Sequence, residues 1–425
     1  MHDIDEPREV FGQAEDAFVA DALEVVRIKF VGSGDELEAS PSFAPEFAHQ
    51  HFDDSEKIVG YKNVKVTVLY SDPTLFLTST FEYDEKTNDN TKCDDIEYKI
   101  KDALPQTQLD AYLSMEKFKQ KLNEQNKFVP FGQLLAKLDL KGSDWEQNFS
   151  LYKFEKGQNA SESQFDQGSK YLERAQALAY WYIDAVSYTA NEEERYLNYF
   201  LFELRPSDGG GAPVYRFAGY VNLYRFYHHP DKDRVRIAQM LVAPAYRRKG
   251  LGPRLLRAIY DDLCRAESVY DITVESPSDA FLYMRDYVDC ANCAKLPEFT
   301  PEKLRKGFSN EMREESRKTH KLNKTQCRRV YEILRLSHTN MNIPAEKEAF
   351  KTELLKRLKR SMMDQKDGSK LSHALRSDRH SLCFALNSLN PDQQSLQLIS
   401  LYENTMASYK VVLARLARYE KNFVI

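Results

Sequence analysis

Cysteine is scarce in this sequence, and long apolar runs are missing from it. Six cysteines in 425 residues are too few and too scattered for the dense disulfide framework of a small secreted domain. No stretch approaches the ~18 consecutive apolar residues that a membrane-spanning helix needs, and the first ten residues, MHDIDEPREV, lack the apolar segment of a secretory signal. We therefore expect free thiols and a soluble intracellular protein without a membrane partner.

A strong charge of either sign is also missing. The 60 Lys and Arg residues and the 65 Asp and Glu residues leave a formal net charge of -5, which gives no electrostatic footprint for nucleic acid and mildly favours a cationic substrate. The sequence shows no internal repeat and no long heptad pattern that would indicate self-association. With 42% hydrophobic residues, the chain can bury a large core in two or three domains.

The first of three predicted regions, residues 1–144, has mixed α/β character. A helix is expected near residues 111–124, and the turn-forming residues Lys141–Asp144 indicate where the region ends. Segments rich in β-branched and aromatic residues predict three strands, over 22–30, 58–70 and 75–83.

The second region, residues 145–300, is expected to form a sheet that is covered by helices. A strand near 148–154 is followed by a polar loop that includes Gly168, and then by an apolar helix over about 170–187 that should pack on a sheet. A glycine-rich loop at Asp208–Gly211 predicts a hairpin. The two antiparallel strands that flank this loop are expected over 199–204 and 217–224.

The third region, residues 301–425, is helical and basic. Apolar residues recur at helical spacing within Arg328–Leu336, which predicts a small bundle, and the polar stretch Asp364–Asp378 is interpreted as a linker. Just before this region, Cys290 and Cys293 form a single pair without a second Cys or His pair that could complete four zinc ligands. We interpret them as structural thiols. The whole chain thus predicts the α/β (α+β) class.

A strand, a glycine turn and a helix follow one another between Arg236 and Leu263. The turn Arg247–Gly252 directs free backbone N–H groups and the positive end of the helix dipole toward a ligand before the helix, which suits a pyrophosphate. Alone, such a turn is more often an ordinary connection. It is not a Walker loop, because no Ser or Thr follows Lys249, and it lacks the third glycine of a dinucleotide fingerprint.

In this context, Arg247-x-x-Gly250-x-Gly252 resembles the acetyl-coenzyme A motif of the GNAT superfamily of N-acetyltransferases. Further segments up to about Leu336 extend the resemblance; they are Pro45–Phe47, His49–Gln50, Gly60–Lys62, Gln239–Leu241, Asp271–Ser278, Arg285–Asp286 and Arg328–Leu336. Together they resemble the type B histone acetyltransferase family. The resemblance implies a GNAT fold in residues 145–300, flanked by an N-terminal α/β domain and a C-terminal helical region, and a histone (protein-lysine) N-acetyltransferase activity.

The resemblance implies acetyl-coenzyme A as co-substrate, and no metal. The strand would hydrogen-bond the pantetheine arm and the turn would wrap the pyrophosphate, mainly through backbone groups. A backbone N–H near Leu241 or Val242 would stabilise the oxyanion. Pro253 is tolerated because an N–H in the first helical turn has no intrahelical partner. The residues expected to bind the coenzyme are Met240, Leu241, Val242, Arg247, Arg248, Lys249, Gly250, Leu251, Gly252 and Pro253.

The resemblance also implies two catalytic carboxylates, Glu275 and Glu194. A lysine ammonium is not a nucleophile at neutral pH, so a base must remove a proton before the amine attacks the thioester directly. From its position alone, Glu275 would be interpreted as a solvated surface group. Ser276 stands where the family usually has an acid, which places more weight on Glu275 and Glu194.

The acceptor that the resemblance implies is lysine in the N-terminal tail of newly synthesised histone four, presented within a histone complex. The implied partner is a WD-repeat propeller histone chaperone, and the implied location is cytoplasm and nucleus. Arg225 would have to turn its charge elsewhere or bind peptide carbonyls. Two alternatives stay open: a GNAT enzyme for another amine, and a non-catalytic histone-binding module. The residues expected to contact the tail are Asp54, Ser55, Glu56, Tyr224, Arg225 and Phe226.

Overall fold

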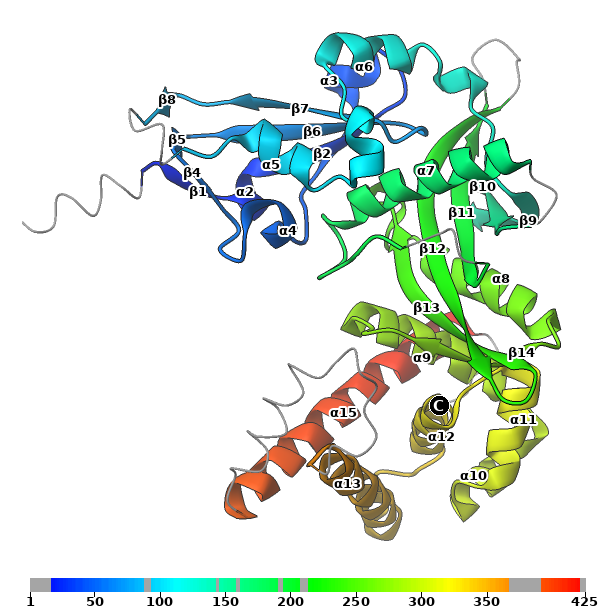
Figure 1. Ribbon diagram of the computed structural model, residues 1–425. Coiled ribbons are helices and arrows are strands. Elements are labelled where there is room, and N and C mark those ends of the chain that lie inside the picture. The colour runs from blue at the N-terminus through cyan, green and yellow to red at the C-terminus, as the bar shows by residue number, and fades with distance from the viewer. Residues whose placement is uncertain are drawn as a thin grey trace, which may run out of the picture. The chain divides into compact units, whose positions relative to one another are not determined.

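The computed structural model divides the chain into two compact units. The first comprises the chain up to Phe226 together with Val235–Leu255, and the second comprises Tyr227–Arg234 and everything from Leu256. Strands dominate the first unit and helices the second (Figure 1), which confirms the predicted α/β (α+β) class. None of the described helices is both long and apolar enough to cross a bilayer. The described residues are 17–87, 93–142, 145–157, 161–189, 194–206, 213–366 and 391–420.

A four-stranded sheet in the order β3-β2-β6-β7 forms the N-terminal part of the first unit. β2 and β6 are parallel, and the other pairs are antiparallel. Residues 22–25 form a helical turn instead of the start of the predicted strand, because Asp21 caps them by accepting the Leu23 N–H at 2.8 Å. The strands of this sheet are β2 (Val26–Val31), β3 (Ser42–Phe43), β6 (Lys65–Ser71) and β7 (Leu77–Glu82).

Short elements surround this sheet. Two small antiparallel ladders pair β1 (Val19–Asp21) with β4 (Lys57–Val59) and β5 (Tyr61–Lys62) with β8 (Glu85–Lys86). The helix predicted near residues 111–124 is present as α6, which buries Phe118. The helical segments are α2 (Ala22–Val25), α3 (Glu36–Ala39), α4 (His49–Phe52), α5 (Ile96–Asp102), η2 (Gln106–Ala111), α6 (Met115–Leu122) and η3 (Gln125–Lys127).

The first unit also contributes to a second sheet, in which five of the strands follow the order β13-β12-β11-β10-β9. β9 to β12 pair in succession as antiparallel neighbours. The predicted antiparallel strands around Asp208–Gly211 are confirmed as β11 and β12, although this loop itself lies outside the described residues. The strands are β9 (Gln133–Lys141), β10 (Glu146–Phe154), β11 (Tyr196–Arg205), β12 (Val214–His228) and β13 (Lys232–Val242).

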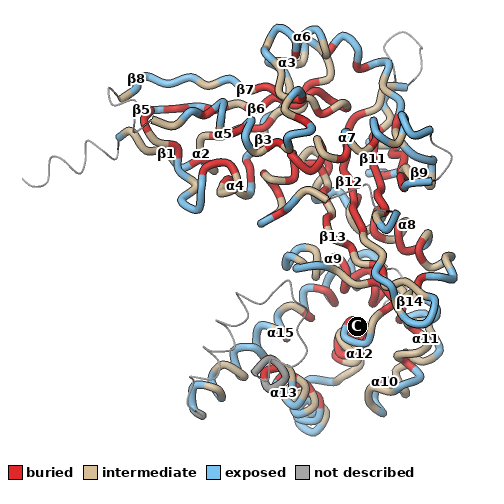
Figure 2. The backbone as a smooth tube through the Cα atoms, in the orientation of Figure 1, coloured by how far each residue is buried: buried red, intermediate tan, exposed pale blue. Residues whose placement is uncertain are grey.

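Helix α7 (Glu162–Ala179) packs on this second sheet, and its inner side and strand β11 are largely buried (Figure 2). The prediction of a helix over 170–187 was wrong at both ends. The helix begins at Glu162, because Ser161 and Gln164 form a capping box. Gly168 lies inside the helix, where a Cβ would come within 2.4 Å of the Phe154 ring. Only glycine allows this close approach.

The two compact units do not divide the chain at residues 144 and 300. β9 and β10 pair across Lys141–Asp144, with Glu146 opposite Lys141, although residues 143 and 144 themselves lie outside the described part. Helices α9 (Asp279–Cys293) and α11 (Asn310–His320), which precede and follow residue 300, pack together. Long-range pairing therefore joins segments that local turn signals separate.

The second unit gathers the C-terminal helices and one strand, β14 (Val269–Val274). Helix α12 packs against α9 and α15, and it buries Val330, Ile333 and Leu334, as the helical spacing predicts. The helical segments are α9 (Asp279–Cys293), η5 (Pro297–Phe299), α10 (Pro301–Lys306), α11 (Asn310–His320), α12 (Lys324–Ser337), α13 (Pro344–Lys366) and α15 (Pro391–Tyr419).

Two further predictions concern segments of this unit. Cys290 and Cys293 are buried free thiols on α9, as expected for structural cysteines. The linker predicted over Asp364–Asp378 begins within the last residues of α13, and its remainder lies outside the described residues.

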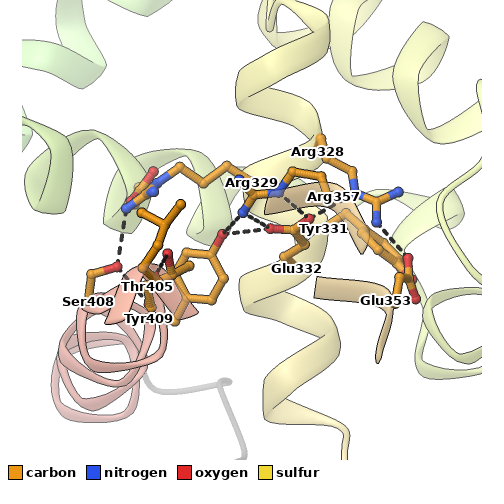
Figure 3. Close-up of polar contacts among 11 residues, drawn as sticks. Arg328, Arg329, Tyr331, Glu332, Glu353, Arg357, Thr405, Ser408 and Tyr409 are labelled. Carbon is orange, nitrogen blue, oxygen red and sulfur yellow. Dashed lines mark hydrogen bonds and ion pairs between the residues drawn. The ribbon is translucent and has the colours of Figure 1, made fainter. Parts of the chain in front are cut away.

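A buried glutamate connects three of the C-terminal helices (Figure 3). Glu332 of α12 is 2% exposed, and its carboxylate accepts from Arg357 of α13 at 2.7 Å and from the Tyr409 hydroxyl of α15 at 2.7 Å. Arg328 also donates to it at 3.0 Å. A buried carboxylate is costly unless it is paired and hydrogen-bonded. These three donors therefore specify how the helices pack.

Candidate active site

The predicted strand, turn and helix are all present, and the strand is β13. This strand ends at Val242, a short 3-10 segment, η4 (Pro244–Tyr246), follows, and α8 (Leu251–Arg265) begins at the predicted glycine turn. The buried Tyr246 hydroxyl donates to Glu203 at 3.0 Å. Burial raises the pKa of Tyr246 well above its usual range, so the hydroxyl stays protonated as a donor. This contact holds the start of the turn against the sheet.

The backbone of the turn has an unusual shape at Arg248 and Gly250. Their φ values are 61° and 88°, both in the left-handed region, and they stand on either side of Lys249. Such alternation turns successive N–H groups into a concave surface that can bind an anion, and the start of α8 adds the positive end of a helix dipole. Among the described residues, apart from Gly250 and its two chain neighbours, no atom lies within 4 Å of the position that a Cβ on Gly250 would occupy. The turn therefore has room for a phosphate beside its backbone.

Arg247, which was expected to bind the coenzyme, uses its side chain within the protein. Its Nε donates to the Val242 carbonyl at 2.8 Å, and its Nη1 pairs with Glu46. The guanidinium also lies over the Tyr182 ring, 4.7 Å from the centroid. The side chain of Arg247 therefore fixes the turn to the end of β13. Its backbone N–H is engaged as well, because it donates to the Pro244 carbonyl at 3.3 Å. The sequence marks Glu46 as part of the family resemblance but does not indicate this partnership.

Gly219 controls the course of the strand segment that was expected to bind pantetheine. A Cβ on Gly219 of β12 would lie 2.3 Å from the Leu241 carbonyl oxygen of β13, so only glycine permits the two strands to approach this closely. Leu241 is buried, whereas Met240 and Val242 are half-buried. The two residues that flank the buried Leu241 thus remain partly accessible.

Gln239 links β13 to Ser187, which follows α7 in the chain. Its buried side-chain amide donates to the Ser187 carbonyl at 2.7 Å, and its oxygen accepts from the Tyr220 hydroxyl at 2.8 Å and from Gln176 at 3.1 Å. A buried amide that is satisfied in this way orders its surroundings. Gln239 was identified in the sequence only as part of the resemblance, without this positioning role.

Glu194 is exposed and lies beside the strand end that carries Tyr224–Phe226. The Arg225 N–H donates to the Arg195 carbonyl at 3.0 Å, which connects the two segments. The Arg225 guanidinium donates to the buried carboxylate of Glu155 at 2.5 Å. This pair neutralises the positive charge of Arg225, which was expected either to turn its charge elsewhere or to bind peptide carbonyls.

Asp54, Ser55 and Glu56, which were expected to contact the tail, have different environments. Asp54 and Ser55 are exposed. Glu56 instead accepts the backbone N–H groups of Ala48 and His49 at 2.6 Å and 3.0 Å, which holds the start of α4. Of the two acids expected to contact the tail, Asp54 is therefore the one that is presented to solvent.

Glu275 belongs to the second unit, where it directly follows β14 as an exposed residue. The strand before it is firmly held, because the Ile272 N–H donates to the Lys321 carbonyl at 2.8 Å and Arg285 donates to the Ile272 carbonyl at 3.0 Å. Ser276 has a φ of 34°, and the Ser278 hydroxyl caps α9. A rigid strand thus presents an exposed carboxylate at a short turn.

Three family models match the chain. "Histone acetyl transferase HAT1 N-terminus" matches residues 18–184, "Acetyltransferase (GNAT) family" matches residues 171–281, and "Histone acetyltransferase type B catalytic subunit, C-terminal" matches residues 285–336. The GNAT match includes the β13–α8 turn and Glu275. The protein is therefore an acetyltransferase of the GNAT class, which implies the use of acetyl-coenzyme A.

Curated relatives define the family more narrowly. The histone acetyltransferase type B catalytic subunit of Homo sapiens is 31% identical over 401 residues, which cover 92% of each chain. The Mus musculus protein of the same name is also 31% identical, over 92% of this chain and 93% of its own. A relative in Dictyostelium discoideum is 28% identical over 90% of this chain and 84% of its own. The chain belongs to the family of histone acetyltransferase type B catalytic subunits, which confirms the resemblance seen in the sequence.

Proposed function

We propose that this histone acetyltransferase acetylates lysine side chains in the N-terminal tail of newly synthesised histone four. The observation that carries the proposal is the similarity along the whole chain to relatives named type B catalytic subunits, at 92% coverage of both chains for the human protein. Two local features support a cationic acceptor. Asp54 is exposed, and Glu155 neutralises Arg225 in the segment expected to face the tail.

The residues after β13 fit a phosphorylated coenzyme. The open space beside Gly250 and its left-handed backbone suit a pyrophosphate at the start of α8. Arg248 and Lys249 are exposed there and add positive charge. In this proposal Met240–Val242 hydrogen-bond the pantetheine arm, and the backbone of Arg247–Pro253 holds the pyrophosphate.

Proton transfer is the task assigned to the two carboxylates. Bound acetyl-coenzyme A supplies a thioester whose carbonyl carbon accepts the lysine nitrogen. Glu275 first removes a proton from the lysine ammonium, directly or through water, because an amine with a pKa of about 10.4 has no free electron pair at neutral pH. Glu194 holds the ammonium before this step. A backbone N–H near Leu241 or Val242 donates to the carbonyl oxygen as negative charge develops on it.

The bond changes balance without a covalent enzyme species. The nitrogen–carbon bond forms and the carbon–sulfur bond breaks. The leaving thiolate takes up the second proton that the nitrogen loses, while the first passes from Glu275 to solvent. Because Ser276 is not an acid, Glu275 and Glu194 carry this chemistry in the proposal.

Partners and location follow from family membership alone. We include in the proposal a histone complex as the form of the substrate and a WD-repeat propeller histone chaperone as a partner, in cytoplasm and nucleus. Co-purification of the full chain with such a propeller and histone four, under conditions that retain type B complexes, is the expected result. Isolation of the chain without either would contradict this part.

Competing acceptors provide the test of the proposed reaction. Initial rates of transfer from labelled acetyl-coenzyme A would be measured for a histone four tail peptide, for the same peptide with every lysine replaced by arginine, and for spermidine. We expect the native peptide to have the highest kcat/KM and the arginine peptide to accept no label. A preference for spermidine would overturn the histone assignment and leave the GNAT class intact. Peptide binding without transfer would indicate a binding module.

A further inference from the structure

The second unit contains a cavity of about 510 Å³ that the proposed acetyl transfer does not use. All of the residues that line it belong to this unit. Positive charge dominates among these described lining residues, where Asp271 is the one carboxylate. Such a surplus of cations predicts an anionic ligand. The cationic residues are Arg234, Arg285, Arg313, Arg317 and Lys324.

Two of the five cations stabilise the walls of the cavity. Arg234 donates to both oxygens of Asp271 at 2.7 Å and 2.8 Å, a bidentate pair that cancels both charges. Arg285 is 5% exposed and donates to the Tyr260 hydroxyl and to the Ile272 carbonyl at 3.1 Å and 3.0 Å. These two arginines are therefore committed to the protein.

The other three cations retain positive charge. Arg317 pairs with Glu314 at 2.7 Å, and Arg313 reaches the same carboxylate only at 3.8 Å. One carboxylate thus serves two guanidinium groups. Lys324 is exposed, and no ion pair within the described part of the chain reaches it. The three cations together carry two positive charges more than Glu314 neutralises, and this excess is available to a ligand.

The first turn of α12 provides a second kind of anion donor at the same cavity. Residues Asn323–Gln326 line it, and the Asn323 side chain already accepts the Gln326 N–H at 3.0 Å. The N–H groups of Lys324 and Thr325 lie in the first turn of the helix, where backbone donors have no acceptor within the helix. Backbone N–H groups and the dipole of this 14-residue helix add to the side-chain charges.

The aromatic residue in the cavity is not available for stacking. The Tyr270 ring stacks on His228, with centroids 4.0 Å apart and an angle of 12°, and the Arg317 guanidinium lies 4.5 Å from its centroid. These two contacts engage the ring, which argues against a nucleobase that would need such a face. A phosphate has several oxygens, and these can accept from arginine guanidinium groups and from backbone N–H groups that approach from different directions.

We propose that this cavity is a binding site for a phosphomonoester, carried either by a phosphorylated protein side chain or by a free metabolite. Val274 and Pro277, which flank Glu275 and Ser276 in sequence, line the same cavity. An occupant therefore contacts the loop that carries the proposed base. The binding itself does not depend on the proposed acetyl transfer.

Calorimetric titration of the full chain tests this site. Saturating coenzyme A is present throughout, so that the β13–α8 turn cannot bind the added phosphate. The probes are inorganic phosphate, a phosphoserine peptide and the same peptide without the phosphate. We expect the two phosphate probes to bind and the unmodified peptide not to bind. Tighter binding of the phosphopeptide than of inorganic phosphate supports a protein ligand, and equal binding supports a free metabolite.

Two variants distinguish this cavity from other basic surfaces. Arg313→Gln with Lys324→Gln removes two of the available cations, and we expect phosphate affinity to fall by about tenfold or more. Lys318→Gln is the matched control, because Lys318 is an exposed cation of α11 that does not line the cavity. It should change affinity less than twofold. Absence of phosphate binding in the wild type, or equal affinities in the double variant and the wild type, would overturn the proposal, provided that thermal unfolding shows both proteins folded.

Discussion

The turn after β13 and the turn after β14 both connect a strand to a helix, but they expose different parts of the chain. In the first, Arg248 and Gly250 adopt left-handed φ values and the Arg247 side chain is held by Val242 and Glu46. The backbone is therefore what this turn offers to a ligand. In the second, the turn presents the exposed side chain of Glu275. Affinity for coenzyme should thus depend on backbone shape in one turn, and proton transfer on a single side chain in the other.

Glu275→Gln should give the largest effect, because it removes the proposed base and keeps its size. We expect kcat to fall by about 10²–10⁴-fold, the range typical of general-base catalysis, while the Kd for acetyl-coenzyme A changes less than twofold. Stopped-flow or radiometric transfer to the histone four peptide measures the first quantity, and calorimetry measures the second. Asp279→Asn is the control, because Asp279 is an exposed acid of the same unit at the start of α9. A comparable loss of kcat in the control would contradict a specific role for Glu275.

Gly250→Val tests the other turn. A β-branched residue is strained at the φ of 88°, which costs on the order of 1–3 kcal/mol, although open space surrounds the position. The turn should relax and acetyl-coenzyme A affinity should fall by about 10- to 100-fold. Gly157→Val is a matched control, because Gly157 has a φ of 84° and equally open surroundings. Equal losses of affinity in both variants would show that the effect is general destabilisation.

Glu46→Gln removes the carboxylate partner of Arg247. The pair is partly exposed, with side-chain exposures of 53% for Glu46 and 28% for Arg247, so its contribution is modest. We expect the KM for acetyl-coenzyme A to rise by about two- to fivefold, because the turn is less firmly fixed. Glu38→Gln, at an exposed acid of α3, should leave the KM unchanged. A lower KM for Glu46→Gln would instead show that the freed Arg247 side chain binds phosphate.

Ser276→Asp should have an effect as small as that of Glu46→Gln. It introduces an acid next to Glu275, and aspartate tolerates the φ of 34° found there. A second carboxylate favours capture of the lysine ammonium, and we expect kcat to rise by about two- to fivefold. Ser276→Asn has nearly the same shape without the charge, and should leave kcat at the wild-type level. Equal changes in both variants would assign the effect to the backbone.

Local patterns predicted those parts of the fold that local forces decide. The strands β11 and β12, the apolar face of α12 and the glycine turn before α8 follow from spacing and turn chemistry within short windows. The start of α7 was missed although its capping box, Ser161 and Gln164, is a local signal. Gly168 looks like a loop residue in the sequence, but it lies inside the helix, where it allows the Phe154 ring to approach closely.

The candidate site shows the same limit. The family motif indicated the coenzyme turn and Glu275, but no local pattern pairs Arg247 with Glu46, which is 201 residues away. Nor does the sequence show that the Glu56 carboxylate is taken up by the start of α4. An acidic residue in a motif can serve the backbone instead of a ligand, and only its hydrogen bonds distinguish the two.

The most direct test measures single-turnover acetyl transfer and coenzyme affinity side by side in the wild type, Glu275→Gln and Gly250→Val. Saturating acetyl-coenzyme A separates the chemical step from binding. For Glu275→Gln we predict slow acetyl transfer with normal coenzyme affinity. For Gly250→Val we predict near-normal acetyl transfer with weak coenzyme affinity. Wild-type transfer in Glu275→Gln would contradict the account and move the base to Glu194 or elsewhere, and a joint loss of affinity and rate in that variant would show that Glu275 shapes the coenzyme site instead of removing the proton.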